Sequence, residues 1–414
     1  MAATDNDATQ AIATVVKLSQ LHAVDRGLLI VPARDRGVWK RAFGAVPSVF
    51  RDPAVLPEGT RRGDQDPWEL SGRTEKRKAV SGRILHGGFT MKTGIRRLLL
   101  YLPLIFLALL LLASVLILFI GYYGRKPLPM ISPQARVAPE LSRLPEIEVC
   151  WIETGHAFGS GSFSMTASGL LIRHPKGDVL IDGGNSSHFD QESAQFPLWQ
   201  RLVMNAIPGQ LKPRLDLSRA LSTVGESPAR IKWLIPSHAH LDHVGGYEDL
   251  PRIPVLLSPL EREFLHDPAA LRSGAVISQQ ARMLEDGRAI DLSFSDTPYE
   301  TYARSQDLYG DGSIIVVPLP GHTPGSVGIF INLDSKNRIF YIGDAALQTN
   351  EVTKRLKKPF FIQDAEPQQA EEEVQKLNAL HQLLPELAFI PAHGRSDYFR
   401  VFPAGPETCV SRTR

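Results

Sequence analysis

The chain is best interpreted from one stretch, Ser237-His238-Ala239-His240-Leu241-Asp242-His243-Val244-Gly245-Gly246. It places three histidines and one aspartate within six positions, directly after the apolar run 231–235. An apolar run of this length predicts a buried strand, and the two glycines predict a tight loop after it. Imidazole and carboxylate groups are common ligands of first-row metals. The stretch therefore predicts a metal site at a strand end rather than a histidine-rich surface loop.

Three downstream segments repeat this pattern of a short apolar strand followed by one possible metal ligand beside a glycine. The ligands and the runs that precede them are His322 after 314–317, Asp344 after 339–342 and His393 after 387–390. Each segment alone is weak, because a single histidine after a strand is more often a core or surface residue. Together with the first stretch they indicate one shared metal centre.

In their order along the chain, the His-Ala-His-Leu-Asp-His motif at 238–243, His322, Asp344 and His393 resemble the ligand set of the metallo-β-lactamase superfamily. The resemblance covers roughly residues 144–402. It implies an α/β fold, a four-layer αββα sandwich with the metals at one edge between two β-sheets. It also implies the ligands: a first metal held by His238, His240 and His322, a second held by Asp242, His243 and His393, and Asp344 bridging both.

The implied chemistry is hydrolysis. Two adjacent metals would lower the pKa of a bound water and supply hydroxide for attack on an electrophilic carbonyl or phosphorus. Asp242 is expected to take a proton for the leaving group, and Asp182 to support the site without binding metal. All the implied ligands offer nitrogen or oxygen, so the resemblance favours two zinc ions and leaves iron or manganese open.

Several substrates fit such a centre. The ligand set looks like that of acyl-homoserine lactonases and glyoxalase II, which favours a lactone, ester or thioester. Lactonases of that type carry a tyrosine shortly after the bridging aspartate, and this chain has Leu347 there. A phosphodiesterase is the alternative. A β-lactamase ranks lower, because many of those have a cysteine where this chain has Asp344. A non-catalytic metal-binding protein would be expected to have lost ligands.

Residues 98–120 form an uncharged run rich in leucine and isoleucine. About twenty apolar residues span a bilayer, so we expect a single uncleaved transmembrane anchor. Lysine and arginine are denser before the run than after it, which places the N-terminus in the cytoplasm. The catalytic domain would then be periplasmic or otherwise extracytoplasmic.

The expected organisation of the chain follows from these features. The segments are 1–90, disordered or an extension upstream of a start at Met91; the anchor 98–120; a proline-rich linker 121–145; the catalytic domain 146–402; and a tail 403–414. Within the domain we expect helices at 215–224, near Pro259, at 277–284 and at 366–384. The aromatic insert 185–214 is expected either to line a substrate pocket or to pack on the scaffold.

The composition limits the classes of partner that the chain is expected to bind. The 414 residues carry a formal net charge of +2, which gives no sign of nucleic-acid binding, so a small-molecule substrate and the membrane are the expected partners. Cys150 and Cys409 have no metal-site or redox-motif spacing. We expect two unpaired thiols, although an oxidising compartment would allow a disulfide. His381 is expected to be a packing residue, and His156 and His188 have no assigned metal role.

Overall fold

The computed structural model describes residues 93–133, 135–157, 164–198, 200–202, 209–210, 215–359 and 362–412. The expectation for residues 1–90 lies outside these residues. The same holds for Trp199 and Met204 of the aromatic insert.

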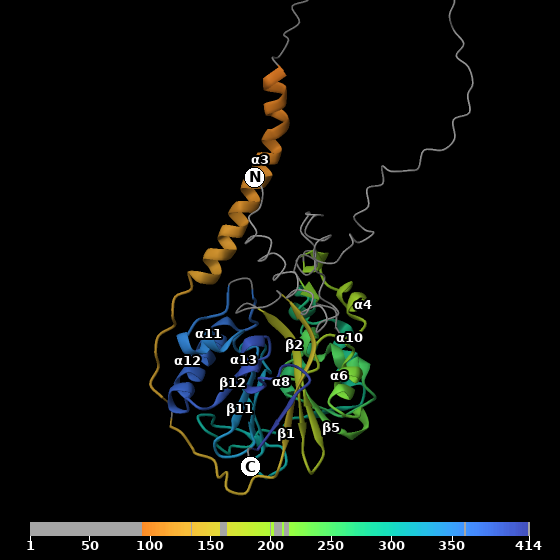
Figure 1. The fold of residues 1–414 in the computed structure, drawn as a ribbon, viewed down its shortest axis with the longest axis vertical. Helices are drawn as coiled ribbons and strands as arrows, with labels where there is room; N and C mark the ends of the chain where they lie inside the picture. The colour runs from red at the N-terminus through yellow and green to blue at the C-terminus, as the bar shows by residue number, and fades with distance from the viewer. Residues whose placement is uncertain are drawn as a thin grey trace, which may run out of the picture. The chain divides into compact units, whose positions relative to one another are not determined.

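Two β-sheets form the centre of the domain that was expected at 146–402 (Figure 1). In the described part of the chain the first has eight strands, ordered β13-β1-β2-β3-β5-β6-β7 with β4 beside β1. Its strands are β1 (Glu148–Ala157), β2 (Met165–Arg173), β3 (Asp178–Ile181), β4 (Gly209–Gln210), β5 (Ile231–Ile235), β6 (Val255–Leu257), β7 (Ala289–Asp291) and β13 (Cys409–Ser411). The second has five, ordered β12-β11-β10-β9-β8: β8 (Gln306–Asp307), β9 (Ile314–Pro318), β10 (Val327–Asn332), β11 (Arg338–Gly343) and β12 (Ala388–Pro391).

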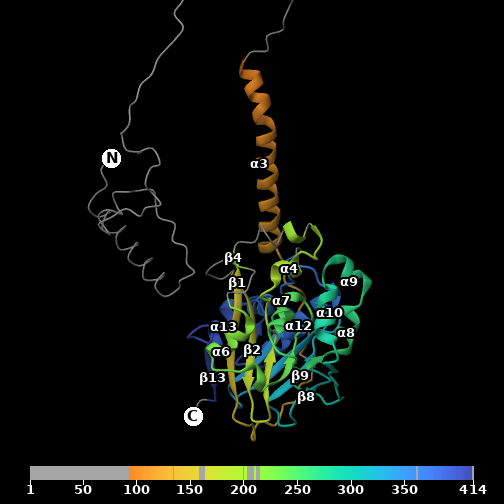
Figure 2. The ribbon, with the colours of Figure 1, turned by 90° about the vertical axis from the view of Figure 1, so that its right-hand side faces the viewer.

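Helices surround the two sheets, and most of them cover an outer face, whereas the helix at 395–401 packs Tyr398 against Trp151 between the sheets. They are α4 (Phe189–Ser193), α6 (Leu217–Thr223), α7 (Leu241–Val244), α8 (Pro259–Leu265), α9 (Pro268–Ser273), α10 (Ser278–Glu285), α11 (Thr349–Lys354), α12 (Pro367–Leu383) and α13 (Arg395–Val401), with short 3₁₀ turns η2 (Pro228–Arg230) and η3 (Gly245–Asp249). The helices expected at 215–224, near Pro259, at 277–284 and at 366–384 are therefore present as α6, α8, α10 and α12. Figures 1 and 2 show the green helices on one side of the strands and the blue helices on the other.

Three layers of buried side chains separate these four layers of structure. Strand β1 shows the principle, because alternate residues of a strand point to opposite faces. Val149 and Trp151 pack between the two sheets, whereas Cys150 and Ile152 pack against the helices on the first sheet. A third cluster joins the second sheet to α11 and α12. This arrangement confirms the expected αββα sandwich.

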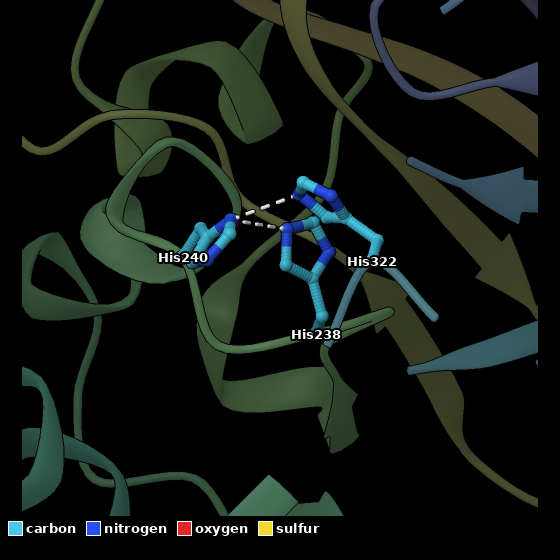
Figure 3. Close-up of side chains that lie close together, drawn as sticks. All are labelled: His238, His240 and His322. Carbon is cyan, nitrogen blue, oxygen red and sulfur yellow. Dashed lines mark hydrogen bonds between the residues drawn. The ribbon is translucent and has the colours of Figure 1, made fainter. Parts of the chain in front are cut away.

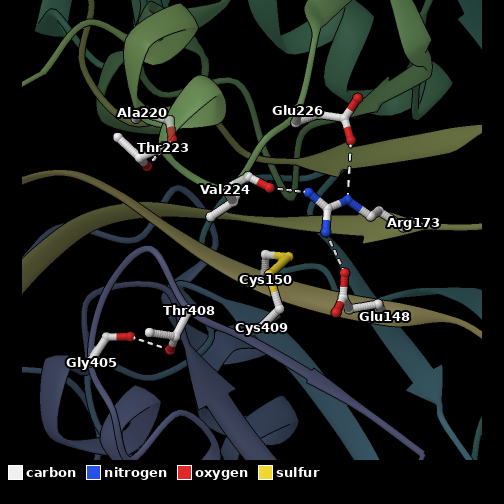
Figure 4. Close-up of a disulfide and its surroundings, with 10 residues drawn as sticks. All are labelled: Glu148, Cys150, Arg173, Ala220, Thr223, Val224, Glu226, Gly405, Thr408 and Cys409. Carbon is white, nitrogen blue, oxygen red and sulfur yellow. Dashed lines mark hydrogen bonds and ion pairs between the residues drawn. A yellow bond between two sulfur atoms is a disulfide. The ribbon is translucent and has the colours of Figure 1, made fainter.

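The C-terminal residues belong to the first sheet. Strand β13 pairs with β1 in a register that sets Cys409 opposite Cys150, and the two form a disulfide (Figure 4). The expectation of two unpaired thiols is therefore wrong, because the pairing of β13 with β1 brings together cysteines 259 positions apart. In the segment 403–414, which was expected to be a tail, residues Cys409–Ser411 form strand β13.

The apolar run lies in the long helix α3 (Thr93–Tyr123). Residues Ile105–Tyr123 are long and apolar enough to cross a membrane by length and composition. After α3 the chain is extended and contacts the domain at several places. Arg125 forms an ion pair with Glu351, and Val137 exchanges two backbone hydrogen bonds with Glu300 at 2.8 and 3.0 Å. The linker thus lies on the domain surface.

Candidate metal centre

The seven residues expected as ligands meet where strands of both sheets end. The loop after β5 brings His238, His240, Asp242 and His243 from the first sheet. The loops after β9, β11 and β12 bring His322, Asp344 and His393 from the second. Residues 241–244 form the short helix α7, with His240 at its N-cap. The centre therefore lies at the edge between the two sheets.

A first group of donor atoms consists of three imidazole nitrogens (Figure 3). Nδ1 of His240 lies 3.0 Å from Nε2 of His238 and 3.0 Å from Nε2 of His322. Three nitrogens that converge in this way form one side of a metal site.

A second group lies beside the first and contains Asp242, His243 and His393. Nε2 of His393 lies 3.3 Å from Oδ2 of Asp242, and Nε2 of His243 lies 3.9 Å from Oδ1 of Asp242. Asp344 stands between the groups. Its Oδ2 is 3.4 Å from Nε2 of His322 and 3.3 Å from Nε2 of His393.

Two buried atoms of this cluster have no hydrogen-bond partner among the described residues, Nε2 of His243 and Oδ1 of Asp344. They are 3.6 Å apart. Buried polar atoms are almost always satisfied, so a pair of unsatisfied donor atoms needs an explanation. A metal ion bound between them would satisfy both, and the surrounding donors are of the nitrogen and oxygen type that suits such an ion.

The electrostatics of the cluster also suit a cation. Burial lowers the pKa of His238, and neighbouring imidazoles lower it further. Burial likewise lowers the pKa of His240, to about 3. For His243 the effect of burial is outweighed by the carboxylates of Asp182 and Asp344, which raise its pKa to about 10. The first group thus favours neutral imidazole, which is the metal-binding form, while the buried carboxylates favour a positive charge between them.

Partners outside the cluster orient the ligands. Asp182 lies within 2.7 Å of Nδ1 of His243 and accepts hydrogen bonds from the backbone N–H of Ser237 at 2.6 Å and from the Tyr341 hydroxyl at 2.7 Å. Nδ1 of His393 lies 2.8 Å from the Thr166 carbonyl oxygen. Such contacts fix the ring orientation of a metal-binding histidine. Asp182 itself therefore holds a supporting position, as expected.

Sequence reasoning missed two further parts of this support. The carboxylate of Asp364 lies 2.9 Å from Nδ1 of His322, and it also pairs with the buried Lys358, whose ammonium group donates to the Asp344 carbonyl oxygen at 2.6 Å. The segment that carries both residues has no motif or periodicity that would have pointed to them.

The other missed residue is Glu261 of α8. Its buried carboxylate accepts hydrogen bonds from the Ala239 N–H at 2.7 Å, the Thr323 hydroxyl at 2.6 Å and the Gly325 N–H at 3.1 Å. It therefore ties the loop of His238 and His240 to the loop of His322. Gly325 has to be small, because a Cβ there would lie 2.1 Å from the Glu261 nitrogen.

A cavity of about 620 Å³ opens beside the donor cluster. Its walls are mostly apolar, and Phe189 and Phe196 of the aromatic insert are among them, so this part of the insert lines the pocket. His156 also lines the cavity, whereas His188 is absent from its wall. Asp242 lies at the boundary, with a side chain that is 43% exposed. The described wall contains no lysine or arginine.

Comparisons with known proteins agree with this geometry. The model of the metallo-beta-lactamase superfamily matches residues 165–393, more than half of the chain. The chain is 29% identical over 181 residues to the N-acyl homoserine lactonase AttM of Rhizobium radiobacter, which covers 43% of this chain and 64% of that protein. It is 26% identical over 211 residues to AttM of Azorhizobium caulinodans, covering 51% of this chain and 75% of that protein. The chain thus spans less than two thirds of the first of these relatives.

A solved structure of an N-acyl homoserine lactone hydrolase, with the product N-hexanoyl-L-homoserine at its catalytic metal centre, has a TM-score of 0.46 and 16% identity. It covers 61% of this chain and 94% of that one. The converging histidine and aspartate side chains could hold metal ions, and from the family match the chain belongs to the metallo-beta-lactamase superfamily.

Proposed function

We propose that the cluster is a dinuclear metal centre. His238, His240 and His322 would hold the first metal, Asp242, His243 and His393 the second, and Asp344 would bridge them. The observation that carries this proposal is the position of Asp344, whose Oδ2 lies within 3.4 Å of a histidine nitrogen from each group. Nitrogen and oxygen donors without thiolate suit zinc, with iron or manganese as alternatives.

The reaction that we propose is hydrolysis of a lactone, ester or thioester. Bound metals would lower the pKa of a water and polarise the substrate carbonyl. Asp242 would take the proton and pass it to the leaving group, because its carboxylate is partly exposed at the cavity wall. The relatives named as lactonases support this substrate class. Leu347, where such lactonases carry a tyrosine, lines the cavity and makes it more apolar.

A panel of substrates tests this assignment. The purified, metal-loaded protein should hydrolyse lactones, esters or thioesters faster than bis-nitrophenyl phosphate and nitrocefin. The reason is the cavity wall, which offers apolar side chains and has no lysine or arginine for a phosphodiester among its described residues. Faster turnover of bis-nitrophenyl phosphate would favour a phosphodiesterase. Faster turnover of nitrocefin would favour a β-lactamase.

We also propose that α3 anchors the enzyme in a membrane, with the catalytic domain on the extracytoplasmic side. Apolar side chains described in this helix are largely exposed: Phe106, Leu111 and Ile117 are 63, 66 and 59% exposed. Lipid would remove this apolar surface from water. The disulfide supports the location, because disulfides persist in oxidising compartments.

Fractionation tests the anchor. Full-length protein should sediment with membranes and resist washing with high salt, because burial of an apolar helix does not depend on ionic contacts. Detergent should release it. A chain that starts near Pro139 should be soluble and retain metal, and recovery of the full-length chain in the soluble fraction would contradict the anchor.

A further inference from the structure

The end of α3 is fastened to the catalytic domain by Arg125. Its Nε donates to the Tyr122 carbonyl oxygen in the last turn of the helix at 2.7 Å, and its Nη1 donates to the Lys357 carbonyl oxygen at 2.9 Å. The same guanidinium pairs with Glu351, and both side chains are nearly buried, at 8% and 2% exposure. Two more bonds follow between Leu128 and Arg355. These contacts join the residues that follow α3 to the domain.

This attachment is linked to the wall of the cavity through Glu351. Glu351, which binds Arg125, also accepts a hydrogen bond from the Leu347 N–H at 2.8 Å. Leu347 lines the cavity and follows Asp344 by three positions. One ion pair and one hydrogen bond thus connect the end of α3 to the cavity wall. Because two residues span at most about 7 Å, Tyr123 lies close to Arg125. With α3 as the proposed anchor, the cavity would therefore lie close to the membrane surface.

Two exposed leucines, Leu198 and Leu202, are neighbours in sequence of residues that line the cavity. Phe196 and Gln200 line the cavity, and the Gln200 amide contacts the Gly274 carbonyl oxygen at 3.4 Å. Leu198 and Leu202 are both in helical conformation and are four positions apart, a spacing that favours the same side of a helix. They are 68% and 62% exposed. Exposed leucines beside a membrane-proximal cavity would gain free energy from contact with lipid.

We propose that the mouth of the cavity lies against the membrane that holds α3, with Leu198 and Leu202 in contact with lipid. The substrate would then be an amphiphile, with a hydrolysable carbonyl group and an apolar chain that enters the cavity from the bilayer. The apolar wall suits such a chain. This inference rests on the proposed anchor and the proposed hydrolysis, and it adds the direction from which the substrate arrives.

Fluorescence tests the membrane contact without using activity. Full-length protein carrying Leu202→Cys labelled with the fluorophore NBD would be placed in phosphatidylcholine vesicles. Its emission should shift to the blue and be quenched by nitroxide-labelled lipid. The matched control is Ile290→Cys on β7, which is 45% exposed and absent from the cavity wall. Equal, weak quenching at both positions would overturn the contact.

Activity tests the substrate route. The measured quantity is the ratio of turnover of a dodecanoyl ester in vesicles to turnover of a soluble butyryl ester. The double variant Leu198→Asp/Leu202→Asp should lower this ratio by about tenfold or more, because it removes the free energy gained when two leucines are buried in lipid. Ile290→Asp should leave this ratio unchanged. An unchanged ratio in the double variant would overturn the route. Quenching at position 202 without hydrolysis of either ester would refute the proposed hydrolysis while supporting the contact. Hydrolysis of both esters without quenching would refute only the contact.

Discussion

Asp344→Ala should remove most of the bound metal from both positions of the purified protein and abolish hydrolysis. The physical reason is that one carboxylate lies within reach of both donor groups, 3.4 Å from His322 and 3.3 Å from His393. A full centre contains two metal ions, and loss of the shared ligand weakens both sites at once. Elemental analysis of the purified variant measures this directly.

Variants of the other ligands should separate the two sites. His322→Ala removes a nitrogen from the first group and should lower the occupancy of the first metal more than that of the second. His393→Ala should do the reverse. A titration with Zn²⁺ would then show one weakened step for each of these variants and two weakened steps for Asp344→Ala.

His381→Ala is the matched control for loss of a histidine. His381 lies on α12, where its ring meets that of Phe389 edge-on with centroids 5.6 Å apart, and it belongs to neither donor group. Its replacement should cost some packing energy but leave the metal content unchanged. Circular dichroism has to confirm that each variant is folded. A folded Asp344→Ala protein with full metal content and normal hydrolysis would refute the dinuclear proposal.

The ligands could be predicted from the sequence because their signal is local. Each follows a short apolar strand, and the strands expected at 231–235, 314–317, 339–342 and 387–390 are present as β5, β9, β11 and β12. Helix α12 could equally be predicted from the sequence, since Val374, Leu377 and Leu380 share one face of it and are buried. A short strand and the residue that follows it can be predicted in this way because both depend on only a few neighbouring positions in the sequence.

The supporting residues lacked such a signal because their partners are distant in sequence. Glu261 lies in the first turn of α8, where a carboxylate is ordinarily explained by its favourable interaction with the helix dipole. Only the fold shows that it is buried and bound to loops 22 and 64 positions away. Asp364 and Lys358 are a further case, since each gains its role only when the loop after α11 folds back on His322.

The disulfide was missed for the same reason. Strand β13 is three residues long, too short to stand out in a polar C-terminal segment, and only its register with β1 sets Cys409 against Cys150. In the chain-entropy view, a crosslink between residues 259 positions apart restricts the unfolded chain strongly. The crosslink should therefore contribute substantially to the stability of the domain.

Reduction of this disulfide should lower the free energy of unfolding by about 2–5 kcal/mol. The effect should appear as a lower melting temperature of the purified protein in dithiothreitol than in its absence. The double variant Cys150→Ser/Cys409→Ser should melt at the lower temperature in both conditions, which separates loss of the crosslink from other effects of the reductant. Its zinc content below the transition should be unchanged, because neither cysteine belongs to the two donor groups that contain the histidines. Equal melting temperatures for the oxidised wild-type protein and the double variant would mean that β13 holds its place in the sheet without the crosslink. The attachment of β13 to the sheet would then depend on its packing and pairing with β1, and not on the crosslink.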